Sequence, residues 1–206
     1  MHLWYVSYGS NLLAERFHTY LTGSDAASRF GVHPPAPDPT LPVDDRWLWI
    51  DHALYFAGVS KRWGGSSAFI SWENGAEAPS LAHAYLITRD QFAHVAATEN
   101  GVNHIDLPDG IGRGDWAPLP LPRTVEPHRG KYDALLRLPD IDGAPAWTVT
   151  SSVVRERGVP SDAYRATIAR GLEDSTLPID GETYLDVAVG RSRTITLPSR
   201  PGPATP

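Results

Sequence analysis

The sequence contains no cysteine, and this absence excludes several kinds of chemistry at once. Disulfide bonds, thiolate metal sites and a cysteine nucleophile are all ruled out. Any catalysis must therefore rely on oxygen and nitrogen groups.

Long apolar runs and clusters of basic residues are also missing. No stretch approaches the ~20 apolar residues of a membrane-spanning helix, and the formal net charge is −6. Neither a nucleic acid nor an anionic membrane is the expected partner. The first residues lack a basic segment followed by an apolar run, so we expect a cytoplasmic protein. A small-molecule ligand is favoured, and the sequence predicts no oligomeric state.

The eight histidines form no motif typical of a zinc hydrolase. His104 and Asp106, two positions apart, come closest to a pair of metal ligands. We therefore expect no metal site.

What is present indicates a folded domain with both helices and strands. Of 206 residues, 41% are hydrophobic and 20% are charged, a composition that supports one core over residues 1–195. The proline-rich end, residues 196–206, is predicted to be a disordered tail. Two further proline-rich segments, 23–46 and 102–130, are expected to be long loops that could border a pocket.

Hydrophobic patterns place the regular elements between these loops. Residues 3–8 predict a strand, followed by a turn at Gly9 and a helix from Asn11 onward. A second helix is predicted to start at Pro160-Ser161. Further strands are predicted over residues 48–56, 67–72, 82–87, 131–138, 146–151 and 185–189, and an antiparallel sheet is favoured.

A helix over residues 89–99 has signals at both ends. Thr88 and Gln91 match a capping box, and Gly101 is a suitable stop. Glu99 lies seven residues after Phe92, on the apolar stripe of this helix, so its carboxylate should point inward. Burial and the helix dipole both disfavour a charged carboxylate there, which suits a group that acts first as base and then as acid. Alternatively, the helix frays and Glu99 is solvated.

The segment Tyr8-Gly9-Ser10-Asn11-Leu12 places small polar residues where a strand turns into a helix. Unpaired amides at such a position can bind an anion. Simple capping by Ser10 or Asn11 is the alternative. Ser10 is a poor nucleophile candidate because the pattern is not Gly-x-Ser-x-Gly. The pair Gly64-Gly65 indicates a hairpin turn or a close backbone approach.

Taken in order, several segments together resemble the γ-glutamyl cyclotransferase-like family. They are Tyr8-Gly9-Ser10-Asn11-Leu12-Leu13, Trp63-Gly64-Gly65 with Ala68 and Ile70, the strand to Tyr85, Glu99-Asn100-Gly101-Val102, Gly130-Lys131-Tyr132 and Pro160-Ser161-Asp162-Ala163-Tyr164. The resemblance spans roughly residues 3–175. It implies an α+β fold with a mixed, β-barrel-like sheet and flanking helices.

The resemblance also implies a reaction and its residues. Glu99 would be the catalytic acid and base, and the α-amine of a γ-glutamyl substrate would attack its own γ-carbonyl, releasing 5-oxoproline without a cofactor. The residues implied to bind the substrate are Tyr8, Gly9, Ser10, Asn11, Leu12, Tyr132 and Tyr164.

Three departures from the family pattern concern the site. Asn100 separates Glu99 from Gly101, the stretch before Tyr132 is long, and Trp147 stands where some members carry another pocket tyrosine. Two other functions stay open. Glu99 could activate water in a cofactor-free amide hydrolase or deacylase, or the pocket could bind a metabolite without turnover.

Overall fold

The computed structural model describes residues 1–74, 79–121, 131–153 and 155–194. The predicted tail, 196–206, and Gly130 lie outside the described residues. The strands are β1 (His2–Ser7), β2 (Asp44–Ile50), β3 (His52–Ser60), β4 (Gly65–Asn74), β5 (Ser80–Thr88), β6 (Trp116–Pro118), β7 (Ala134–Ile141) and β8 (Ala144–Thr150). The helices are the short 3-10 helix η1 (Ser10–Leu12) and the α-helices α1 (Ala14–Thr22), α2 (Arg89–Glu99), α3 (Asp162–Glu173) and α4 (Gly181–Thr194).

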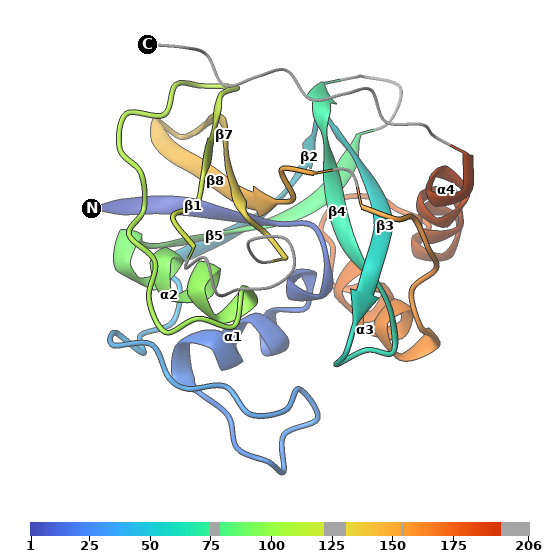
Figure 1. The fold of residues 1–206 in the computed structure, drawn as a ribbon, viewed down its shortest axis with the longest axis horizontal. Helices are drawn as coiled ribbons and strands as arrows, with labels where there is room; N and C mark the ends of the chain where they lie inside the picture. The colour runs from blue at the N-terminus through green and yellow to red at the C-terminus, as the bar shows by residue number, and fades with distance from the viewer. Residues whose placement is uncertain (75–78, 122–130, 154, 195–206) are drawn as a thin grey trace.

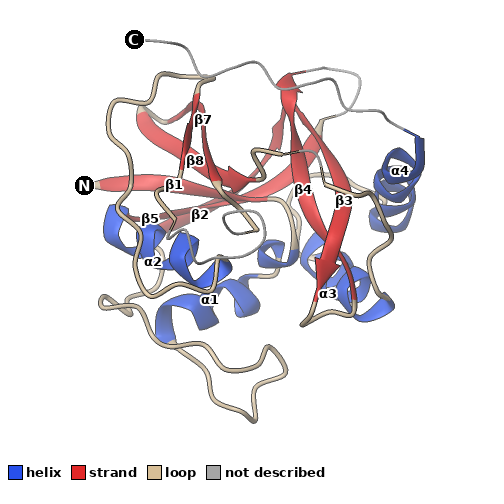
Figure 2. Cartoon of the chain, in the orientation of Figure 1, coloured by secondary structure: helices blue, strands red, loops and turns tan. Residues whose placement is uncertain are grey.

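The strands form two sheets, as Figure 2 shows. Six of them lie in the order β2-β5-β1-β8-β7-β6, and β3 pairs with β4. Because β1 runs parallel to β8 while its other neighbour, β5, is antiparallel, the larger sheet is mixed. The predicted α+β class and mixed sheet are confirmed, and among the described strands every pairing except that of β1 with β8 is antiparallel, the arrangement that the strand pattern favoured. In the described part of the chain the strands form two sheets rather than one closed ring.

Strand β1 is buried on both faces, which explains its unbroken apolar run. Leu3 and Tyr5 belong to the core cluster under α1 and α2, while Trp4 and Val6 belong to the cluster beside β3, β4, α3 and α4. Successive side chains of a strand point to opposite faces, so four neighbouring residues serve two cores. Figure 1 shows this strand running above α1 and α2 toward the β3–β4 pair.

Two predicted strands were wrong. Residues 48–56 belong to two strands, because the chain turns at Asp51 and continues into the second sheet. Residues 185–189 lie in α4, where Leu185 and Ala188 are buried and Val187 is exposed. The two buried residues are three positions apart, a spacing typical of a helix. A short apolar run by itself does not distinguish a helix from a strand. Strand β6 was missed within the second proline-rich loop, and η1 precedes the first α-helix.

The glycine pair after Trp63 allows two backbones to meet. Gly64 has a φ of +70°, and a Cβ added to Gly65 would lie 2.4 Å from the amide nitrogen of Ser161. The two alternatives that the sequence left open, a hairpin turn and a close backbone approach, are both present. The close approach holds the start of α3 against the turn between β3 and β4, which brings Tyr164 to the site described next.

Candidate functional site

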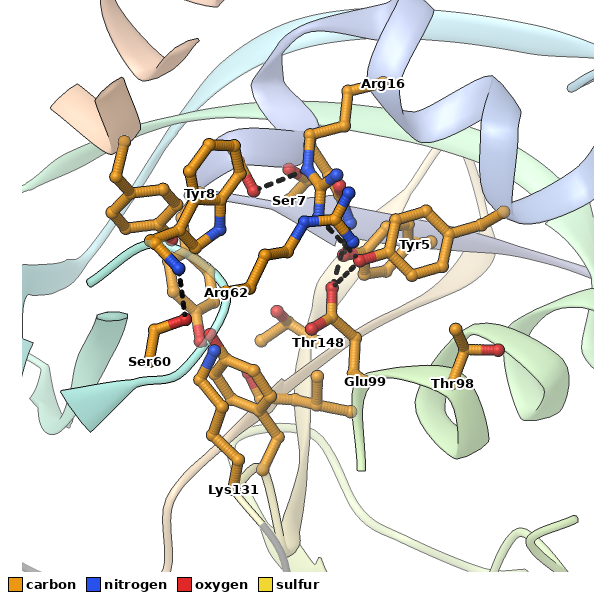
Figure 3. Close-up of a pocket in the computed structure, with 18 of the residues that line it drawn as sticks. Tyr5, Ser7, Tyr8, Arg16, Ser60, Arg62, Thr98, Glu99, Lys131 and Thr148 are labelled. Atoms are coloured by element: carbon orange, nitrogen blue, oxygen red, sulfur yellow. Dashed lines mark hydrogen bonds between the residues drawn. The ribbon is translucent and has the colours of Figure 1, made fainter. Parts of the chain in front are cut away.

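A cavity of about 190 Å³ opens where β1, η1, α1, α2, β8, α3 and the β3–β4 turn meet. Figure 3 shows its lining. The lining residues are Tyr5, Ser7, Tyr8, Gly9, Ser10, Asn11, Arg16, Tyr20, His33, Ser60, Arg62, Trp63, Thr98, Glu99, Lys131, Tyr132, Thr148, Val149 and Tyr164. All of the predicted site residues lie here except Leu12, whose side chain is fully buried in the core.

Local signals place Glu99 at the last position of α2. The capping box at Thr88 is complete, with both reciprocal hydrogen bonds to Gln91. At the other end Gly101 has a φ of +66°, and the amides of Gly101 and Val102 donate to the carbonyls of Thr98 and Ala97. This is a Schellman motif, which ends a helix sharply. The predicted bounds of the helix are confirmed, and Glu99 faces the cavity rather than open solvent.

One oxygen of the Glu99 carboxylate is held and the other is open. The hydroxyl of Tyr20 donates to Oε1 at 2.7 Å, and the Asn11 amide reaches the same atom at 3.4 Å. Within the described residues Oε2 accepts no hydrogen bond. A carboxylate fixed through one oxygen keeps the other for a ligand proton.

The turn from Tyr8 to Asn11 is held from several directions. The Tyr8 hydroxyl donates to the carbonyl of Val149 at 2.6 Å, and Asn11 also donates to the hydroxyl of Tyr5 at 3.1 Å. Neither η1 nor α1 has a side-chain cap, so the capping alternative was wrong. Among the described residues the backbone amides of Gly9, Ser10 and Asn11 find no acceptor, which leaves them available to an anion.

Arg16 is a site residue that the sequence analysis missed. It is 2% exposed, its Nε donates to Ser10 Oγ at 2.8 Å, and its Nη2 donates to the Tyr20 hydroxyl at 2.9 Å. Its Nη1 is buried and has no partner in the described part of the chain. Arg16 precedes Tyr20 by four residues, so the helical period could have placed it on the buried face. A buried guanidinium without a carboxylate calls for a bound anion.

Two more cations and a histidine from a distant loop complete the lining. Arg62 comes from the β3–β4 turn, and Lys131 comes from the segment before β7. Burial lowers the pKa of Lys131 below its ordinary value. His33, in the loop between α1 and β2, accepts a hydrogen bond from Arg62 at 3.0 Å. Burial, followed by the charges of Arg16 and Arg62, lowers the pKa of His33 to about 4. At neutral pH this histidine is therefore uncharged.

Asn100, the first departure from the family pattern, connects the end of α2 to a pocket tyrosine. Its side chain donates to the carbonyls of Ala96 and Tyr132 and accepts from the amide of Tyr132, all at 2.9 Å. The hydroxyl of Tyr132 donates in turn to the carbonyl of Ala68, and the amide of Ala68 donates to Tyr164. These contacts fix Glu99 relative to the opposite wall.

Four polar atoms that line the cavity are buried without a partner among the described residues. They are Ser7 Oγ, Asn11 Oδ1, Arg16 Nη1 and Thr148 Oγ1. Buried polar groups are nearly always hydrogen-bonded, so four exceptions in one cavity indicate a site for a polar ligand. Burial also raises the pKa values of Tyr5, Tyr20, Tyr132 and Tyr164, which keeps their hydroxyls protonated.

Other candidates from the sequence lie elsewhere. Trp147 is not part of the lining and packs edge-on against Phe92. His104 and Asp106 bond to each other on the surface. Over the described ranges, no three His, Cys, Asp or Glu side chains gather as metal ligands. In the same ranges, no helix combines the length and the apolar character needed to cross a bilayer.

No model of a known protein family matches the chain. Among curated proteins, it is 28% identical to histone deacetylase 5 of Arabidopsis thaliana over 207 aligned positions. The match covers 92% of this chain but only 31% of that protein. The chain thus spans about a third of the relative's length.

Solved structures resemble the chain over nearly its whole length. A γ-glutamyl cyclotransferase is 15% identical with a TM-score of 0.55, and the alignment covers 100% of this chain and 94% of that one. An uncharacterized human protein is 17% identical with a TM-score of 0.52, at 99% and 94% coverage. YkqA from Bacillus subtilis is 17% identical with a TM-score of 0.52, covering 91% of this chain and 54% of YkqA. The expected fold is confirmed: the chain has the fold of γ-glutamyl cyclotransferase.

Proposed function

We propose that the chain cleaves a γ-glutamyl amide by intramolecular cyclisation, releasing 5-oxoproline and a free amine. One observation carries this proposal: Glu99 presents an open carboxylate oxygen to a cavity that also contains, among the described residues, backbone amides without an acceptor and one guanidinium nitrogen, Arg16 Nη1, without a partner. A substrate with an α-amine and an α-carboxylate on one carbon needs a base next to an anion site. The fold neighbours and the motif series from Tyr8 to Tyr164 support the same reaction.

The α-carboxylate of the substrate would bind the amides of Gly9, Ser10 and Asn11. Arg16 bonds to Ser10 through Nε, so its unpaired Nη1 would add a positive charge beside these amides. Two hydrogen bonds connect the anion site to the base: Arg16 Nη2 donates to the Tyr20 hydroxyl at 2.9 Å, and this hydroxyl donates to Glu99 Oε1 at 2.7 Å. The anion site and the base therefore lie within reach of one amino acid head group. Holding the α-amine in this position favours ring closure, because the amine and the γ-carbonyl that it attacks belong to the same substrate molecule.

The proton transfers balance through Glu99. The carboxylate takes a proton from the α-ammonium, and the neutral amine attacks the γ-carbonyl carbon to form the ring C–N bond. Glu99 then protonates the departing nitrogen as the old C–N bond breaks. In all, the ring nitrogen gives up two protons and the departing nitrogen gains two, so Glu99 starts and ends ionised. No protein nucleophile is required.

The test is the variant Glu99→Gln, with release of 5-oxoproline from γ-glutamyl-alanine and from γ-glutamyl amines as the readout. General acid and base catalysis contributes about 10²–10⁴-fold to rate, so we expect kcat to fall by at least the lower figure while the protein stays folded. Glu173→Gln is the matched control, because Glu173 also ends a helix but is exposed.

The products separate the remaining alternatives. Free glutamate instead of 5-oxoproline would indicate an amide hydrolase, and binding without turnover would indicate a metabolite-binding protein. Full activity of Glu99→Gln would contradict the proposed function.

A further inference from the structure

Arg62 lines the cavity and has no carboxylate partner among the residues that the structure describes. The residue is exposed, yet its guanidinium turns toward the cavity, as Figure 3 shows. Its hydrogen bond goes to the uncharged ring of His33, and among the described residues it forms no ion pair. By contrast, Arg29, Arg46, Arg89, Arg113, Arg137 and Arg165 all meet an aspartate or a glutamate.

The loop between α1 and β2 contributes two features that keep Arg62 in place. Gly31 has a φ of +73°, which favours glycine, and a Cβ added to it would lie 2.9 Å from Nη2 of Arg62, so this loop approaches the guanidinium closely. The His33 ring packs against Tyr20 in a tilted arrangement with ring centroids 4.5 Å apart, which restricts the ring that accepts from Arg62. Two distant segments therefore hold one unpaired cation.

This placement brings like charges together. The guanidinium carbons of Arg16 and Arg62 lie 5.4 Å and 5.6 Å from the centroid of the same Trp63 ring. Partial burial and the charge of Arg16 both lower the pKa of Arg62. Neighbouring cations without an anion are unfavourable in the free protein, and a bound anion would relieve the repulsion.

One anion on the ligand would not balance the positive charges that line the cavity. The cavity is lined by Arg16, Arg62 and Lys131 against the single carboxylate of Glu99, since His33 is neutral. The α-carboxylate of a γ-glutamyl group matches the buried end of the cavity, near Arg16. Arg62 and Lys131 are then left for a second anion. Of the three cations only Arg62 is exposed, so it is the one that a departing group directed toward solvent would meet.

We propose that Arg62, held by His33 and Gly31, forms a second anion subsite that binds a carboxylate on the departing amine. The inference rests on the proposed function and assigns a specificity residue to it. The chain should therefore prefer γ-glutamyl conjugates with an acidic leaving group over conjugates of neutral amines.

The experiment compares γ-glutamyl-alanine with its carboxamide, which has the same shape without the charge. A charge-assisted hydrogen bond gives about 10-fold to 100-fold discrimination, so the wild type should show a higher kcat/KM for the acid by that factor. Arg62→Gln should lose this preference by lowering the value for the acid alone. Lys61→Gln is the control, because it removes an exposed charge from the same turn outside the cavity lining. Added salt should reduce the preference in the wild type.

Equal kcat/KM values for the two substrates in the wild type, or an equal loss for both in Arg62→Gln, would overturn the subsite. If neither substrate releases 5-oxoproline, the proposed function fails, and calorimetric titration of the same compounds then tests the subsite alone. Tighter binding of the acid that is lost in Arg62→Gln supports it. Equal binding of acid and amide, or no binding of either, rejects it.

Discussion

Two cavities of the molecule differ in how the charged side chains around them are paired. The cavity at Glu99 measures about 190 Å³, and a second one, between β2 and the β7–β8 hairpin, measures about 310 Å³. In the second, Arg137 pairs with Asp140, which also receives Arg113. In the first, Arg16 and Arg62 form no ion pair with a carboxylate of the described residues. The comparison teaches that the pairing of charges, rather than volume, distinguishes the two cavities.

The largest effect after the loss of Glu99 should come from Tyr20. Tyr20→Phe removes the hydrogen bond to Oε1 and the link to Arg16. Loss of one hydrogen bond to a charged group corresponds to a decrease of about 10-fold to 100-fold in rate. We expect this decrease in kcat, with KM little changed. Steady-state kinetics with γ-glutamyl-alanine measures both constants.

Tyr55→Phe provides the control for Tyr20→Phe. Tyr55 is a buried tyrosine that stacks near Phe69 and does not line the cavity. If the two variants behave alike, the hydroxyl of Tyr20 has no role in positioning Glu99.

A stability measurement tests the paired charges of the second cavity. Arg137→Gln removes an ion pair and a hydrogen bond to the carbonyl of Leu138. A loss of this kind shifts Tm by about 2–4 °C in a domain of this size, and we expect kcat/KM to stay unchanged. Arg62→Gln should do the reverse, with Tm preserved and selectivity lost. A fall in activity for Arg137→Gln would break the distinction between the cavities.

The smallest expected effect is a change in how stability depends on pH. The folded-state pKa of His33 is lowered from 6.5 to about 4. Between these values the unfolded chain binds more protons than the folded one, so stability rises with pH across this window and falls on acidification. His33→Gln retains an acceptor for Arg62 but does not titrate, and its Tm should depend less on pH in this window.

The control for His33→Gln is His104→Gln, since the His104 side chain is 74% exposed. The two variants and the wild type are compared by thermal unfolding across the same window. An unchanged pH dependence in His33→Gln would show that His33 is not held neutral by its surroundings.

Local signals explain why part of the site could be predicted. The capping box at Thr88 and the stop at Gly101 determine α2 within a dozen residues, and the apolar stripe then points Glu99 inward. The turn after Tyr8 is equally local. By contrast, residues 185–189 were assigned to a strand because a short apolar run lacks the period that distinguishes it from a helix.

The cations of the site could not be predicted in the same way. His33, Arg62 and Lys131 come from three segments that the sequence separates by about 30–70 positions. His33 and Arg62 look like ordinary loop residues, and Lys131 looks like the first residue of a strand. Arg16 lies on a helix whose apolar period is clear in the sequence. A single arginine next to the apolar face of a helix is usually expected to be exposed to solvent, so its burial could not be predicted.

The sequence by itself determined the ends of α2, the position of Glu99 on its buried face and the turn from Tyr8 to Asn11, because each depends on neighbours a few residues away. Only the tertiary structure decided which charges surround Glu99. The mixed sheet, the close approach at Gly65 and the loop that holds His33 bring distant residues together, and the energies of unpaired charges arise only once those residues share one cavity.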